Sequence, residues 1–133
     1  TPSNNRSQLT ITKDNKLVVD GYNANPTSMK AALDNFRLIQ ADHKMCILGQ
    51  MGELGDVSEE EHQKVIDLIG EGDFEQVWLV GDNFAKTRHP ANYRLFANVE
   101  EVKTAISTHK PQGFLILIKG SNSNKLVQTV ELL

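Results

Sequence analysis

The sequence lacks the features that would point to nucleic acid, a membrane or an oxidising compartment. Its 14 Lys and Arg residues face 17 Asp and Glu residues, and no basic block with interleaved aromatics occurs, so we expect no nucleic-acid surface. The single cysteine, Cys46, lies in an apolar run, which favours a buried thiol in a reducing compartment such as the cytoplasm. No apolar run approaches the length of roughly 20 residues that spans a membrane.

Two further absences concern metals and nucleotides. The four histidines are scattered without ligand spacing, so a metal site built by this chain alone is not expected. No G-x-x-x-x-G-K-[ST] pattern occurs, and a nucleoside triphosphate would need a phosphate cradle from elsewhere. The 133 residues are enough for one domain. The polar start TPSNNRSQ lacks Met and does not resemble a signal peptide, which suggests a domain excised from a longer protein.

Short apolar runs alternate with amphipathic segments along the chain. The runs, each predicted to be a strand, cover residues 9–12, 17–22, 45–49, 77–81, 93–97 and 114–120. The alternation at this spacing predicts an α/β, Rossmann-like three-layer domain. It would have a mostly parallel sheet of about six strands with helices on both faces. The first run is weak and is separated from the second by TKDNK, which suits an antiparallel edge strand.

Four helices are expected between the strands. Asn25 can cap the first, with Pro26 at its first position and an apolar face that continues to Ile39. The pair Ser58 and Glu61 predicts a capping box for the second. The third opens at Asn98. The fourth starts near Asn124, and its inward side chains are predicted to be Leu126, Val127 and Val130.

Four polar, glycine-rich segments each follow a predicted strand directly. They are DGYNANP, LGQMGELG, VGDN and KGSNS. In a parallel sheet these segments meet at the carboxyl ends of the strands, where open α/β sheets bind their ligands. The sequence therefore predicts a ligand site along one rim of the sheet.

Individual residues on this rim have structural and functional interpretations. Asp20 could cap its own turn, and Asn25 could serve only as a helix cap. Asn23 has no obvious backbone duty, and its amide offers both a donor and an acceptor to a nucleobase or a peptide. Lys119, in KGSNS, could pair with an anion or could bridge backbone carbonyls.

Three of these motifs resemble the bacterial Mur ligases, in the form carried by their D-alanyl-D-alanine-adding members. DGYNANPTSM resembles D-x-Y-N-A-N-P-x-S-M, LGQMGELG resembles L-G-D-M-x-E-L-G, and LIKGSNSNKL resembles V-K-G-S-R-S. PSNNRSQ resembles the junction between the central and last domains. Residues 1–133 are thus identified as a Mur ligase carboxy-terminal (third) domain, with the UDP-binding and central ATP-binding domains absent from the chain.

The resemblance implies an activity for the full-length protein. The family's D-alanyl-D-alanine-adding members join D-Ala-D-Ala to UDP-N-acetylmuramoyl-tripeptide in peptidoglycan precursor synthesis in the cytoplasm. ATP phosphorylates the tripeptide carboxylate, and the incoming amine attacks the acyl phosphate. The resemblance implies that the P-loop and Mg2+ ligands lie mainly on the central domain. This domain would close over ATP, position the dipeptide and be inactive in isolation.

The resemblance also implies roles for particular residues. Arg6 would reach the ATP phosphates as a catalytic cation. The nucleotide-facing turn would consist of Asp20, Tyr22, Asn23 and Asn25, and the loop beside the incoming dipeptide would contain Lys119 and Ser121. Two positions depart from the family pattern: Gln50 stands where an aspartate is usual, and Asn122 stands where an arginine is usual.

Two alternatives stay open at this point. The chain could be a stand-alone nucleotide-binding α/β module, which the length of the natural reading frame would distinguish from a ligase domain. It could also be a phospho-receiver domain, because Asp20 and Lys119 match two of the positions such a domain needs. Residues 49–51 are Gly-Gln-Met, however, so the phospho-accepting aspartate after the third strand is missing. The third residue of the tripeptide is not predicted by any motif.

Overall fold

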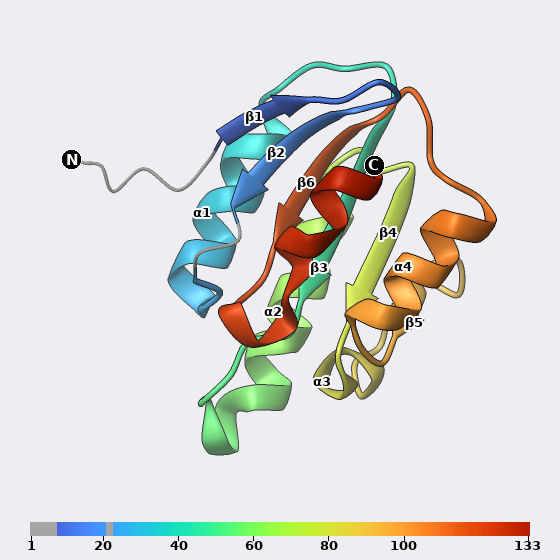
Figure 1. The fold of residues 1–133 in the computed structure, drawn as a ribbon. Helices are drawn as coiled ribbons and strands as arrows, with labels where there is room; N and C mark the ends of the chain where they lie inside the picture. The colour runs from blue at the N-terminus through green and yellow to red at the C-terminus, as the bar shows by residue number, and fades with distance from the viewer. Residues whose placement is uncertain (1–7, 21–22) are drawn as a thin grey trace.

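A mixed six-stranded sheet forms the centre of the computed structural model, which describes residues 8–20 and 23–133 (Figure 1). The strand order is β1-β2-β6-β3-β4-β5. The strands are β1 (Gln8–Ile11), β2 (Lys16–Asp20), β3 (Lys44–Gly49), β4 (Gln76–Val80), β5 (Arg94–Phe96) and β6 (Leu115–Lys119). The α-helices are α1 (Pro26–Arg37), α2 (Ser58–Gly70), α3 (Asp82–Ala85) and α4 (Val99–Thr108). Three 3₁₀ helices complete the described elements: η1 (Gly55–Val57), η2 (Asn122–Asn124) and η3 (Leu126–Leu132).

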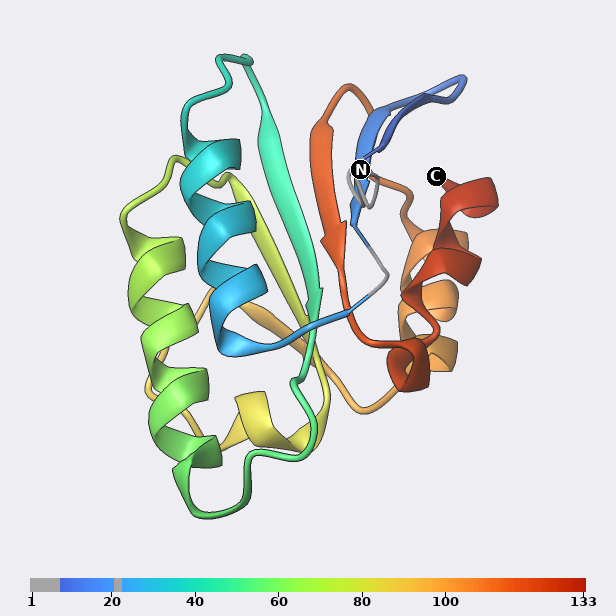
Figure 2. The same cartoon turned by 90° about the vertical axis from the view of Figure 1, so that its left-hand side faces the viewer.

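The elements form three layers. Figure 2 shows α1 and α2 on one side of the sheet and α4 with η3 on the other. β1 pairs antiparallel with β2, and the four remaining strand pairs are parallel. The predicted Rossmann-like class, with its antiparallel edge strand, is confirmed.

Each face of the sheet has its own apolar core because side chains alternate along a strand. All six residues of β3 are buried. Met45 and Ile47 join the core under α4 and η3, whereas Cys46 and Leu48 join the core under α1 and α2. Each fully buried side chain of this size stabilises the fold by roughly 1.5–3 kcal/mol relative to exposure. Burial also raises the pKa of the Cys46 thiol, which keeps it protonated and unreactive.

Two helix caps form as the sequence predicts. Asn25 Oδ1 accepts a hydrogen bond of 2.8 Å from the Ser28 amide, and Ser28 Oγ accepts one of 3.1 Å from the Asn25 amide. Asn98 Oδ1 accepts one of 3.1 Å from the Glu101 amide at the start of α4. Only the cap at Asn25 is reciprocal, and it fixes where the chain turns from the rim into α1.

The capping box predicted at Ser58 is wrong. Ser58 is already the first residue of α2, and the cap position is Val57, which has no side-chain cap bond. The reason is that η1 runs directly into α2, so no extended residue separates them. Ser58 instead offers its carbonyl oxygen to the ring of His62 at 2.7 Å.

The predicted end of the first helix also needs correction. α1 ends at Arg37, so Ile39 lies beyond it and is exposed. Lys44 hydrogen-bonds the last carbonyl oxygens of the helix and of the turn that follows it. Its Nζ donates to the carbonyl oxygen of Phe36 at 2.8 Å and to that of Ile39 at 2.7 Å. Burial lowers the pKa of this lysine. A cation that caps the last carbonyls favours a stop at this point.

The last predicted α-helix is a 3₁₀ helix instead. In η3 the period is three residues, so Leu126 and Thr129 share the buried side. Val127, predicted to face inward, is 59% exposed. Thr129 Oγ1 donates to the Leu126 carbonyl oxygen at 2.7 Å, which satisfies the buried hydroxyl. The short helix α3, which has only four residues, was not predicted.

Within the described residues, no helix is both long and apolar enough to cross a membrane.

Candidate functional site

The predicted rim exists at the lower edge of the sheet in Figure 1, where β2, β6, β3 and β4 end. From β3 the chain proceeds outward through β4 and β5 and then returns across the other face to β6. The strand order therefore reverses between β3 and β6. A reversal of this kind opens a crevice at the carboxyl ends, which is where doubly wound sheets bind ligands.

Asp20 and Lys119 form a buried ion pair on this rim. They are register partners at the ends of β2 and β6, and Nζ lies 3.1 Å from Asp20 Oδ1. The Lys119 side chain is 1% exposed and that of Asp20 is 10% exposed. Within the described residues Asp20 Oδ1 accepts no well-directed hydrogen bond, so we interpret the contact as mainly Coulombic. Removing one partner of an ion pair this buried strongly destabilises the fold, because the other charge is left buried without compensation.

Lys119 also holds the turn that leads into α1. Its Nζ donates to the Asn23 carbonyl oxygen at 2.9 Å, and Ser28 Oγ donates to the same oxygen at 3.0 Å. The Asn23 residue is exposed, and no described hydrogen bond uses its side-chain amide. One lysine thus connects β6, β2 and the turn, and the Asn23 amide has no partner among the residues that the structure describes.

A cavity of about 490 Å³ lies between α1 and the strands β2 and β6. Its lining includes Asp20, Asn23 and Lys119 at the rim and Val18 and Leu117 on the sheet. It combines an apolar floor with polar groups at one end, a composition typical of small-molecule sites.

The segment after β6 closes over the crevice. Asn124 Oδ1 accepts hydrogen bonds from the Ser121 amide at 2.8 Å and from Ser121 Oγ at 3.0 Å. A Cβ atom on Gly49 would overlap the Asn124 side chain, and one on Gly120 would come within 2.9 Å of Oδ1. The two glycines are therefore required by close approach, and Asn124 fills the space between the ends of β3 and β6.

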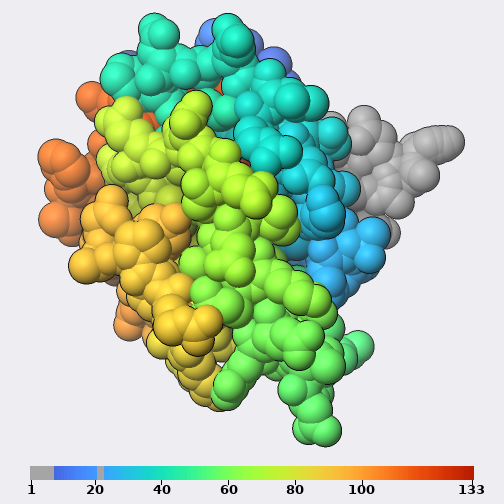
Figure 3. Space-filling model, turned by 180° about the vertical axis from the view of Figure 1, so that it is seen from behind, coloured from blue at the N-terminus to red at the C-terminus, as the bar shows by residue number. Residues whose placement is uncertain are grey.

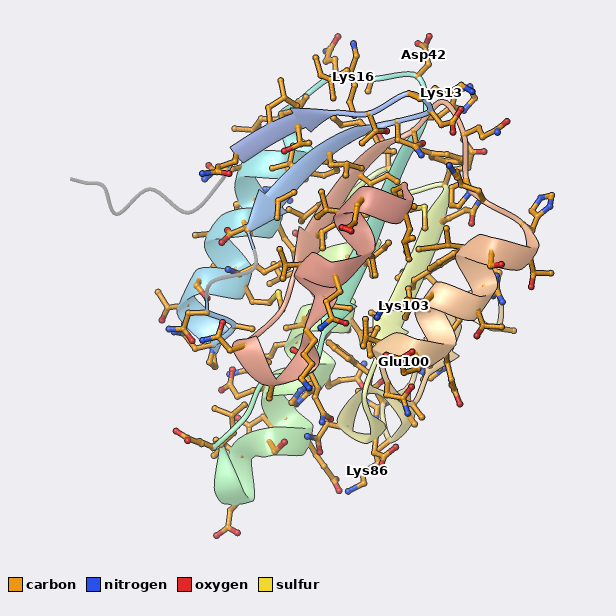
Figure 4. The ribbon with its side chains drawn as sticks, in the orientation of Figure 1. Lys13, Lys16, Asp42, Lys86, Glu100 and Lys103 are labelled. Atoms are coloured by element: carbon orange, nitrogen blue, oxygen red, sulfur yellow. The ribbon has the colours of Figure 1, made fainter. Side chains whose placement is uncertain are left out.

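A second rim cavity, of about 440 Å³, lies between the ends of β3 and β4 and the start of α4. Its lining includes Gln50, Gly81, Asn98, Glu100 and Lys125. In Figure 4 Glu100 and Lys103, which pair at 3.3 Å, mark the nearby start of α4. Lys125 is exposed and forms no ion pair with any described residue. It is the accessible cation of this cavity.

Gln50 is one of the two residues that the sequence resemblance marks as a departure from the expected pattern. Its Oε1 accepts a hydrogen bond of 2.9 Å from the Asn83 amide. Its side chain packs against Gly81, where a Cβ atom would come within 2.6 Å of Oε1. The φ angle of +116° at Gly81 is one that side-chain-bearing residues rarely adopt. Unlike an aspartate, Gln50 retains an N–H donor after its oxygen is engaged.

Two other hollows lie away from the rim. A groove of about 730 Å³ runs between α1 and α2 on the outer face seen in Figure 3. Its charges are largely paired with each other, as in the 2.7 Å contact between Lys30 and Asp34. At the opposite edge of the sheet, Figure 4 labels Lys13, Lys16 and Asp42, which line a cavity of about 430 Å³. Neither hollow contains a site residue predicted from the sequence.

The predicted site residues separate into three groups. Arg6 and Tyr22 lie outside the described residues. Asp20, Asn23 and Lys119 come together around the cavity beside α1. Asn25 serves the helix cap and Ser121 binds Asn124, so both have structural duties within the domain. Sequence reasoning missed Asn124 and Lys125. The signal that could have indicated Asn124 was a pair of glycines, Gly49 and Gly120, at the carboxyl ends of two buried strands.

The fold and its rim define a doubly wound, Rossmann-like α/β domain. The chain belongs to the family described as Mur ligase, glutamate ligase domain, which matches residues 5–122. It is 35% identical over 133 residues to the UDP-N-acetylmuramoyl-tripeptide--D-alanyl-D-alanine ligase of Rickettsia prowazekii, covering 95% of this chain and 29% of that protein. The chain thus spans less than a third of the length of this relative.

Solved structures agree with this assignment. A MurF crystal structure from Acinetobacter baumannii superimposes with a TM-score of 0.78 at 29% identity and covers 98% of this chain and 30% of that one. A MurF ligase from Thermotoga maritima, solved in complex with ADP, has a TM-score of 0.77 at 21% identity over 96% of this chain and 30% of that one, which supports the fold. The resemblance to the D-alanyl-D-alanine-adding ligases is confirmed, and the phospho-receiver alternative is wrong.

Proposed function

We propose that the full-length protein is an ATP-dependent ligase that joins D-Ala-D-Ala to UDP-N-acetylmuramoyl-tripeptide, and that this chain is its carboxy-terminal domain. The observation that carries the proposal is the 35% identity over 133 residues to a ligase of this name. The reaction would take place in the cytoplasm. This chain would act together with its own upstream domains, which supply most of the ATP phosphate and Mg2+ ligands.

The nucleotide would meet the turn at the end of β2. Asn23 fits this task because its exposed amide offers a donor and an acceptor to a base edge. Asp20 and Lys119 hold the turn in place through the buried pair and the bond to the Asn23 carbonyl. Arg6 and Tyr22 keep their proposed places at the phosphates and the nucleotide. In this proposal Asn25 acts through its cap on α1 rather than by direct contact.

The incoming dipeptide needs a cation for its carboxylate. The resemblance points to Lys119 and Ser121, but Lys119 is 1% exposed and already paired, so direct contact would require the ion pair to open. We therefore propose that Lys119 and Ser121 shape the loop beside the dipeptide. Lys125, exposed in the 440 Å³ cavity, would supply the charge. Gln50, on the same cavity, has an N–H that no described residue accepts, and it could donate to a carbonyl or carboxylate oxygen.

The chemistry of the proposed reaction assigns this domain a delivery role. ATP would activate the tripeptide carboxylate as an acyl phosphate, which the amine of the dipeptide then attacks. The catalytic benefit of holding that amine in line is large, because fixing two reactants converts a bimolecular step into an effectively unimolecular one. The domain would provide this by bringing the rim with the dipeptide to the central domain.

The direct test is an assay of the full-length protein with ATP, D-Ala-D-Ala and UDP-N-acetylmuramoyl-tripeptide. We expect one ADP released per ligated product, with the product identified by mass spectrometry, and no ligation by residues 1–133 alone. Lys125→Met should raise the KM for D-Ala-D-Ala, with the KM for ATP little changed. A reading frame that encodes only this domain, or ATP turnover without a ligated product, would favour the stand-alone nucleotide-binding module.

A further inference from the structure

His62 lies fully buried in α2 but reaches the loop that follows β3. Its Nδ1 lies 2.7 Å from the Ser58 carbonyl oxygen, and its Nε2 accepts a hydrogen bond of 3.0 Å from the Met51 amide. The ring also packs edge-on against Phe84 of α3, with centroids 4.9 Å apart. The imidazole thus connects α2, α3 and the loop in one place.

The partners determine the protonation state of this ring. A carbonyl oxygen can only accept, so Nδ1 carries the hydrogen, and a backbone N–H can only donate, so Nε2 must be unprotonated. Only the neutral Nδ1–H tautomer satisfies both contacts. Burial lowers the pKa of His62, while the hydrogen bond to the Ser58 carbonyl and the nearby Glu61 carboxylate act in the other direction and are smaller effects than burial. Glu61 is the one charged group, among those described, that acts on this histidine.

The Met51 amide is adjacent to a residue of the dipeptide cavity. Gln50 N donates to the Val80 carbonyl oxygen at 2.8 Å, and the next amide, that of Met51, is the one that His62 accepts. Two successive amides are therefore anchored, the first to β4 and the second to α2. The Gln50 side chain lies between these two backbone hydrogen bonds, and its Oε1 accepts the Asn83 amide at 2.9 Å. Without His62 the buried Met51 N–H would lose its acceptor, a cost that favours rearrangement of the loop.

We propose that His62 is a positioning residue for the dipeptide site: by accepting the Met51 amide, it holds Gln50 at the cavity shared with Lys125. The inference rests on the proposed function, because it takes that cavity as the site of D-Ala-D-Ala. His62 itself touches no substrate. The lone pair on Nε2, which accepts the Met51 amide, positions the loop. The bulk of the ring packs against Phe84 and does not perform this role.

Three substitutions separate the lone pair from the bulk. In His62→Gln the side-chain oxygen reaches about as far as Nε2, so it can accept the Met51 amide. In His62→Asn the shorter amide reaches about as far as Nδ1, so it keeps the contact with Ser58 and loses Met51. In His62→Phe the packing on Phe84 is kept and both hydrogen bonds are lost.

The experiment measures kinetics and amide exchange on the full-length enzyme. We expect His62→Asn and His62→Phe to raise the KM for D-Ala-D-Ala about ten-fold, the equivalent of one buried hydrogen bond, with the KM for ATP changed less than about two-fold. Hydrogen exchange in the peptide covering residues 50–57 should become faster in both. His62→Gln should restore both quantities toward wild type.

Several outcomes would overturn the inference. One is an unchanged dipeptide KM in His62→Asn, another is an equal rise in both KM values, and a third is a His62→Gln variant no better than His62→Asn. If the enzyme does not use D-Ala-D-Ala at all, the proposed function fails, while the exchange data still decide whether His62 holds the loop. If the variants do not fold, the pH dependence of hydrogen exchange in the wild-type enzyme tests the role of His62 instead. Exchange at residues 50–57, corrected for its intrinsic pH dependence, must rise as acid protonates His62, and constant protection there refutes the link.

Discussion

Replacing Lys119 with methionine tests the ion pair that holds the rim together. The substitution keeps an unbranched, mostly apolar stem of similar length and removes the ammonium group. It leaves the Asp20 carboxylate buried without its cation and the Asn23 carbonyl without one of its two donors. Removing one partner of a buried pair costs about 3–5 kcal/mol. For a chain of this length, the entropy of unfolding converts that loss into a fall in Tm of roughly 10–18 °C.

The assay is urea unfolding of the 133-residue chain at pH 7, followed by circular dichroism, for wild type, Lys119→Met, Asp20→Asn and the double variant. Because the double variant buries no unpaired charge, we expect it to be clearly more stable than the sum of the two single losses predicts. The reasoning is refuted if Lys119→Met unfolds at the wild-type urea concentration. It is also refuted if Lys119→Met lowers the free energy of unfolding by the same amount in the Asp20→Asn background as in the wild type.

Other perturbations give further tests of the fold and the site. Asn25→Ala removes the reciprocal cap of α1 and should lower the free energy of unfolding, measured by urea denaturation, by about 1 kcal/mol. A change below about 0.3 kcal/mol would show that Ser28 caps the helix without Asn25. Asn23→Ala in the full-length enzyme should raise the KM for ATP several-fold, since one hydrogen bond is worth about 0.5–1.5 kcal/mol, and should leave Tm unchanged. Because the pKa of His62 is lowered in the fold, its contribution to stability is complete above the usual value near 6.5 and is lost as pH falls through the lower folded value. Wild-type stability should therefore fall more steeply below pH 6.5 than that of His62→Gln, and parallel curves would contradict this.

Periodicity and cap residues were enough to predict the sheet, its edge strand and the beginnings of α1 and α4. Those features depend on local rules: apolar runs form buried strands, and Asn with an extended backbone caps a helix. The rim followed from topology, because polar segments after parallel strands meet at one edge. The error at Ser58 has a different origin. A capping-box pattern has no effect where the preceding 3₁₀ turn already continues into the helix.

The role of Lys119 could not be obtained from local pattern alone. A lysine after an apolar strand carries no sign of whether it faces solvent or a partner strand. That depends on the register that sets Asp20 opposite Lys119, which is a non-local property. The same holds for His62, whose place on an apolar helix face resembles that of any core residue. Its acceptor role exists only because the loop after β3 returns across α2.

The Asn124 side chain has a consequence for what this scaffold can evolve or be engineered to do. In many doubly wound proteins the crevice at the strand reversal is vacant and admits a cofactor deep between two strands. Here it is occupied from within, and Gly49 and Gly120 leave space for that side chain and little more. A ligand at this crevice would therefore rest on the rim rather than between the two strands. Converting the domain into a permanent cofactor carrier would begin with a smaller residue at position 124, and the gain in retention would come at the expense of rapid exchange.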